Sequence, residues 1–213
     1  MKKTILLFAI LLAVLTGKSQ SKEYYGAMGE ALGQYASCKN IDDFQSLGNR
    51  FSLIANAEKT EWLPFYYHAN CYIIMSFMEP SDAAKKDSYL DIAEKSITKM
   101  IELAPKEAEV YALQSMFYSA RLVVNPMERG QKYGMLSGQA VGMALGFDAN
   151  NPRAKFIKLR NDMGAAQFYG KDPKEYCPQA KELLSSWDTY KVKGPLYPAW
   201  GKDQVAEIVA GCK

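Results

Sequence analysis

The sequence predicts an all-α protein. Nearly every segment shows apolar residues at helical spacing. The breaks between segments carry turn or helix-stop residues, as in Asn150-Asn151-Pro152. No segment shows the period of two, flanked by turns, that is typical of a strand. We therefore expect helices throughout, with no low-complexity linker to divide them into separate domains.

The clearest helix spans 89–104. Charged residues fill the positions between its apolar ones, which gives the helix one wet face. Pro105 follows and should end it. The apolar positions are Leu90, Ala93, Ile97, Met100 and Ala104.

The next segment, 106–124, is apolar on two faces. One stripe contains Val110, Leu113 and Phe117, and the other contains Tyr111 and Tyr118. A helix with two apolar faces must be covered on two sides, so we place it in the inner layer of a helical stack. The same patterns predict further helices at 22–38, 41–57, 61–78, 128–147, 153–168, 173–190 and 202–212.

Residues 1–21 are expected to be a signal peptide. Lys2 and Lys3 precede an apolar run at 5–15, and a small polar stretch at 16–21 follows. The run is too short to span a bilayer. We expect cleavage near Gln20, a single domain at 22–213, a periplasmic or secreted location and no membrane span after cleavage.

The charge balance argues against nucleic acid as a partner. The chain has 26 Lys+Arg and 23 Asp+Glu, and cleavage near Gln20 would remove three lysines and leave the two signs equal. A neutral chain lacks the basic surface that nucleic-acid binding requires.

Four cysteines in an exported protein suggest disulfides, with three possible connectivities. We expect the pair Cys177–Cys212. If the helices containing them pack antiparallel through the turn at Gly194 and Pro195, the start of one meets the end of the other. Cys38 and Cys71 would then form a second pair, at a poorer fit, or stay free.

An alanine-based pattern repeats at a spacing of 47 residues. An alanine is followed by apolar residues at +4 and +7 and by proline at +12. The two copies are Ala93, Ile97, Met100, Pro105 and Ala140, Ala144, Phe147, Pro152; a third, without proline, is Ala180, Leu184, Trp187. A small residue at the alanine position would let two helices approach closely.

This pattern resembles the tetratricopeptide repeat, in which an aromatic-rich first helix precedes the Ala-x3-apolar…Pro helix. The segment from Asn151 onward also resembles the end of exported bacterial proteins of this kind, through Phe168-Tyr169-Gly170 and Pro195-Leu196-Tyr197-Pro198-Ala199-Trp200-Gly201-Lys202. Units here are longer than the usual 34 residues. The resemblance implies a short α-solenoid of about four helix pairs plus a C-terminal capping helix, a binding or scaffolding role, and no catalytic residues.

Aromatic residues are the candidate binding positions, because Tyr and Trp give large, rigid contact areas. Core packing is the competing interpretation, since Trp62 also fills a repeat position. The five candidates are Trp62, Tyr66, Tyr67, Tyr111 and Tyr118.

Five glycines stand four residues apart in one predicted helix, and each costs roughly 1 kcal/mol relative to alanine. They predict either close packing inside the stack or close approach by a ligand or second chain. They are Gly130, Gly134, Gly138, Gly142 and Gly146.

The sequence contains few residues or motifs that would indicate a catalytic or metal-binding site. His68, the single histidine, shares a helix face with Cys71, but no third partner is indicated and a structural zinc site needs four ligands. No phosphate-loop, dinucleotide or hydrolase motif occurs. We expect no catalytic residues, no metal and no cofactor, and no dependence of function on His68.

Three functions remain open, the last of them a purely structural subunit of a larger envelope assembly. The first is a non-enzymatic periplasmic module that binds a protein or peptide partner of unknown identity. The alternative is a small-ligand-binding protein or enzyme with a pocket between helices. A deep closed pocket would favour the alternative, and a continuous open groove would favour the module.

Overall fold

The computed structural model describes residues 21–212, so the predicted signal peptide lies almost wholly outside the described residues. This part of the chain contains nine α-helices, two short 3-10 turns and no strand, which confirms the all-α prediction. In order, the elements are α1 Lys22–Tyr35, α2 Ile41–Ala57, α3 Trp62–Met78, α4 Ala83–Leu103, α5 Ala108–Val124, α6 Pro126–Phe147, α7 Pro152–Phe168, η1 Pro173–Tyr176, α8 Cys177–Ser186, η2 Trp187–Thr189 and α9 Lys202–Ala210.

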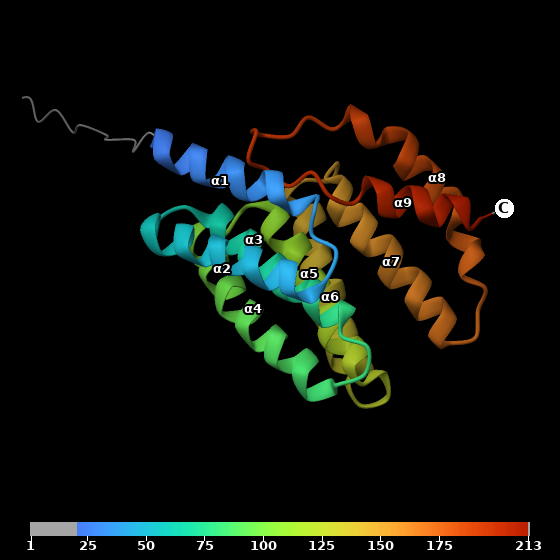
Figure 1. Ribbon diagram of the computed structural model, residues 1–213. Helices are drawn as coiled ribbons and strands as arrows, with labels where there is room; N and C mark the ends of the chain where they lie inside the picture. Colours follow the sequence, from blue (N-terminus) through green and yellow to red (C-terminus); the bar gives the residue numbers. More distant parts are fainter. Residues whose placement is uncertain (1–20, 213) are drawn as a thin grey trace, which may run out of the picture.

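The helices stack in chain order (Figure 1). α3 packs along α4 and α5 packs along α6, while α2 covers α3 on its other side. α5 also contacts α7, as expected for a helix predicted to be apolar on two faces. α8 and α9 lie together across the end of the stack, beside α7.

The repeated alanines occupy the contacts between helices. Ala93, Ala140 and Ala180 are all buried. Gly48 of α2 marks another close contact, since a Cβ there would lie 3.1 Å from the Tyr72 ring of α3. Alanine and glycine have the smallest side chains, so they leave little between neighbouring helices at these buried positions.

Side-chain caps set the helix starts. Asn40 and Asp43 form a capping box at α2, and Asn151 caps α7 by accepting from the Ala154 amide at 2.9 Å. α4 begins six residues earlier than predicted, because Asp82 caps it by accepting from the Lys85 amide. The polar first turns of α4 carry no apolar period by which the sequence could reveal them.

The C-terminal disulfide is present as predicted. Cys177 at the start of α8 is bonded to Cys212 just beyond α9, with 5.8 Å between the Cα atoms. Cys38 and Cys71 are free thiols. Within residues 21–212, no helix combines the length and apolar character needed to cross a membrane.

Removing this disulfide should cost substantial stability. It joins residues 35 positions apart, for which chain entropy gives about 3–4.7 kcal/mol. The Cys177→Ser/Cys212→Ser variant should lose about that much free energy of unfolding in urea titration. The matched control Cys38→Ser should change it by less than about 0.5 kcal/mol. Equal effects in both variants would contradict a clasping role for the disulfide.

Candidate functional site

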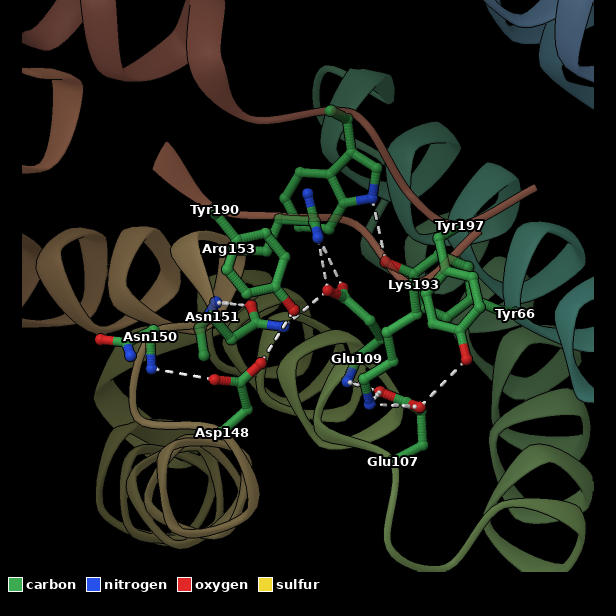
Figure 2. Close-up of polar contacts among 12 residues, drawn as sticks. Tyr66, Glu107, Glu109, Asp148, Asn150, Asn151, Arg153, Tyr190, Lys193 and Tyr197 are labelled. Atoms are coloured by element: carbon green, nitrogen blue, oxygen red, sulfur yellow. Dashed lines mark hydrogen bonds and ion pairs between the residues drawn. The ribbon is translucent and has the colours of Figure 1, made fainter. Parts of the chain in front are cut away.

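A buried ion pair joins α5 to α7. The carboxylate of Glu109 accepts from Arg153 Nε at 2.7 Å and from Arg153 Nη2 at 2.5 Å. Asn151 Nδ2 donates to the same carboxylate at 2.6 Å (Figure 2). The side chains of Glu109 and Arg153 are each only 1% exposed. Three charge-assisted hydrogen bonds therefore compensate two charges that water cannot reach.

The predicted aromatics of α3 hold the chain's own C-terminal segment. Tyr67 donates its hydroxyl to the Leu196 carbonyl at 2.9 Å. The Trp200 indole donates to the Tyr66 hydroxyl at 2.9 Å. Trp62 meets the Tyr197 ring edge-on, with 5.5 Å between centroids. Tyr66 and Tyr67 are buried and Trp62 is half-buried.

The two predicted aromatics of α5, Tyr111 and Tyr118, differ from each other in burial. Tyr111 is buried, donates to the Pro105 carbonyl at 2.8 Å and packs its ring on Phe147. Tyr118 is half-buried, and its ring lies 6.2 Å from that of Tyr133 on α6. The five predicted binding positions thus do not form one open surface. A binding role remains a prediction, and Tyr118 and Trp62 are the two that reach solvent.

His68 and Cys71 face surroundings that disfavour reactivity. His68 Nδ1 lies 2.8 Å from the Ser96 hydroxyl, and burial lowers the pKa of His68 to about 4. Cys71 is fully buried, and burial raises the pKa of its thiol well above the usual range. A neutral thiol is a poor nucleophile. The described part of the chain also gathers no group of three or more His, Cys, Asp or Glu side chains that could hold a metal ion.

The glycines of α6 are not explained by packing. A Cβ added at Gly130, Gly138, Gly142 or Gly146 would meet nothing within 4 Å, and one at Gly134 would make only an ordinary contact with Leu122. Of the two sequence interpretations, close packing fails at these positions. The helix instead exposes bare backbone.

A polar cluster marks where α6 and α7 meet. Asn161 of α7 donates to Ser137 Oγ of α6 at 2.8 Å and accepts from Ser119 of α5 at 2.8 Å. Ser115 of α5 donates to the Ser137 carbonyl at 2.9 Å. This cluster fixes which side of α6 and which side of α7 face each other.

Beyond the cluster the two helices diverge, with the later half of α7 swinging away from α6 (Figure 1). On the Ser137 side of α6, helical spacing next brings Gly134, Gly130 and Met127. On the Asn161 side of α7 it brings Gly164 and Phe168. A Cβ at Gly164 would again meet nothing within 4 Å.

We call these five residues, Met127, Gly130, Gly134, Gly164 and Phe168, the α6–α7 face. Met127 is 83% exposed and Phe168 is 54% exposed. Tyr169, at 75% exposure, follows directly, with its ring edge-on to that of Phe168. These residues are apolar or lack a side chain; Met127, Gly164 and Phe168 are exposed, and Gly130 and Gly134 are half-buried. The glycine spacing indicated α6, but the α7 half, which depends on the angle between helices, has no sequence signal.

Breaking the buried ion pair should be costly. Glu109→Gln keeps the shape but leaves Arg153 charged, buried and unpaired, so the free energy of unfolding should fall by about 3–5 kcal/mol. Glu102→Gln is the control: Glu102 and its partner Lys99 both have exposed side chains, so the loss should stay below about 1 kcal/mol. Equal losses of unfolding free energy in the two variants, measured by denaturant titration, would show that the buried pair contributes no more than a surface pair.

His68 should make stability pH-dependent. Its folded pKa of about 4 lies below the ordinary 6.5. Between these values the unfolded chain binds a proton that the folded chain does not, so stability is complete above pH 6.5 and falls as pH drops toward 4. The loss should reach no more than about 3 kcal/mol. Urea titrations at pH 7 and 4.5 should show a smaller drop for His68→Gln than for the wild type, and equal drops would refute the assignment.

Comparison with known proteins places the chain in a family. No protein-family model matches it, and no curated protein gives a significant match. Among solved structures it is similar to the HusA haemophore from Porphyromonas gingivalis, with 31% sequence identity and a TM-score of 0.77. The alignment covers 92% of this chain and 95% of that chain. The chain belongs to the family of the HusA haemophore.

Proposed function

We propose that this protein is an exported, non-enzymatic haem-binding protein that holds haem on the α6–α7 face. The observation that carries the proposal is this apolar face, found in a chain whose family includes a haemophore. The family likeness to a haemophore supports the coarser part of the proposal, a binding role. The ligand and its location are our inference.

A porphyrin is flat and largely apolar, so it needs a flat apolar surface. Helix backbone at Gly130, Gly134 and Gly164 offers close approach without protruding side chains. Met127 and Phe168 extend the apolar area at the open end. Glycines that destabilise α6 and have no packing role are explained if a ligand covers them.

The iron would take its ligand from residues near the open end. Haem iron in proteins is bound by His, Cys, Met or Tyr. Met127 and Tyr169 are exposed there, whereas His68 on α3 is half-buried and hydrogen-bonded to Ser96. We therefore expect Met127 or Tyr169 to contact the iron, and we expect haem binding to survive His68→Ala within a few-fold.

Export completes the proposal. We propose that residues 1–21 are a signal peptide and that 22–213 form one domain of tetratricopeptide-like helix pairs. The Cys177–Cys212 disulfide supports this, because disulfides persist in oxidising compartments such as the periplasm or outside the cell. The alternative, a scaffold for a protein or peptide partner, is favoured by the helix-pair order, but the α3 aromatics that would line its groove contact the chain's own C-terminal segment.

Filling the face should separate binding from folding. Gly164→Leu puts a side chain into open space on a helix, so the free energy of unfolding should rise by up to about 1 kcal/mol. The same side chain should obstruct the ligand. In an absorbance titration with haemin, the affinity should fall at least about tenfold.

The matched control is Gly26→Leu in α1, also exposed and with nothing within 4 Å of its Cβ. It should gain similar stability and keep full haemin affinity. Metal-free protoporphyrin tests the iron ligand: Tyr169→Phe or Met127→Leu should weaken haemin binding more than protoporphyrin binding. Absence of haemin binding to the wild-type protein, or equal effects of the two leucine variants, would refute the proposal.

A further inference from the structure

A hollow lies at the N-terminal end of α7, the end far from Phe168 and the α6–α7 face. It has a volume of about 400 Å³, within the range of small-ligand sites. It is formed where the α6–α7 turn meets the end of α8 and the chain just beyond η2. Its lining residues are Asp148, Asn150, Pro152, Lys155, Leu183, Ser186, Thr189, Tyr190 and Lys191.

The lysines of this hollow lack counter-charges. Lys155, in the first turn of α7, is half-buried, and Lys191 is exposed. Neither makes an ion pair within the described residues. Lysines elsewhere on this protein, such as Lys158 and Lys202, do pair with carboxylates. A partly desolvated ammonium without an anion favours an anionic ligand.

Both carboxylate oxygens of the one acidic residue lining the hollow, Asp148, accept hydrogen bonds from the protein itself. Asp148 accepts from the backbone N–H of Asn150 at 3.0 Å through one oxygen and from the Tyr190 hydroxyl at 2.8 Å through the other (Figure 2). Its carboxylate therefore does not pair with either lysine. The side-chain amide of Asn150 makes no hydrogen bond within residues 21–212 and can donate to a ligand.

We propose that this hollow binds a small molecule through a carboxylate or phosphate group, with Lys155 and Lys191 as charged donors and Asn150 as a neutral donor. Two ammonium groups and an amide match the acceptor oxygens of such an anion. The open Lys191 side gives the ligand access, and the half-buried Lys155 supplies the interaction least screened by water.

This site is separate from the proposed haem face. Lys155 and Phe168 stand near opposite ends of α7, about 20 Å apart at the helical rise per residue. The inference therefore goes beyond the proposed function and does not depend on it. Either could fail without affecting the other.

The test uses inorganic phosphate and succinate as probes. Each is titrated into the mature protein while ¹H–¹⁵N spectra are recorded. At least one probe should give saturable shift changes in the millimolar range, grouped at 148–155 and 186–191. Lys155→Gln should weaken that binding at least about tenfold, and Lys191→Gln should weaken it less.

Lys181→Gln on α8 is the control: it removes the same charge from an exposed position outside the hollow and should bind as the wild type does. Haemin affinity should be unchanged in all three variants. Binding of phosphate alone identifies a phosphoryl ligand, and binding of succinate alone identifies a carboxylate. No saturable shifts with either probe, shifts spread over the surface lysines, or equal effects of Lys155→Gln and Lys181→Gln would overturn the proposal.

Discussion

The Glu109–Arg153 ion pair determines where α7 lies. Two charges removed from water are tolerated only with near-complete hydrogen bonding, so α5 and α7 have little freedom to shift at this contact. Asn151 serves twice, as the cap of α7 and as a donor to Glu109. The Tyr190 ring lies 5.8 Å from the Arg153 guanidinium and connects the C-terminal segment to the same point. Helix start, helix position and C-terminal segment are thus fixed together.

A helix held firmly at one end can leave the stack at the other. α7 is fixed by Arg153 and again, two turns on, by Asn161 in the serine cluster. Past that cluster, Gly134 of α6 and Gly164 of α7 contribute no side chain to the contact between the two helices. The α6–α7 face would therefore present regular helical backbone to a ligand, which keeps the cost of backbone ordering on binding low.

The sequence patterns predicted the features that depend on residues close together in the chain. Helix positions, the buried alanines and the Cys177–Cys212 pair follow from apolar period, small-residue spacing and antiparallel geometry. The start of α4 was missed because its first turns are polar. The aromatic candidates were mostly covered, because Tyr66 and Tyr67 contact residues about 130 positions away, and no local pattern carries that information. The α6–α7 face was only half visible, since helix divergence is a property of packing.

The position of the α3 and α5 aromatics bears on the choice between a peptide and a flat ligand. The aromatic face offered by α3 and the start of α5 is the kind of surface that binds an extended chain. Here the chain's own residues 190–201 occupy it, with Leu196 buried and Tyr197 bonded to Glu107. An external peptide would have to displace a segment that is secured at Tyr190, at Trp200 and, beyond α9, by the disulfide. Under the proposed function, the ligand would bind the α6–α7 face instead, which this segment does not occupy.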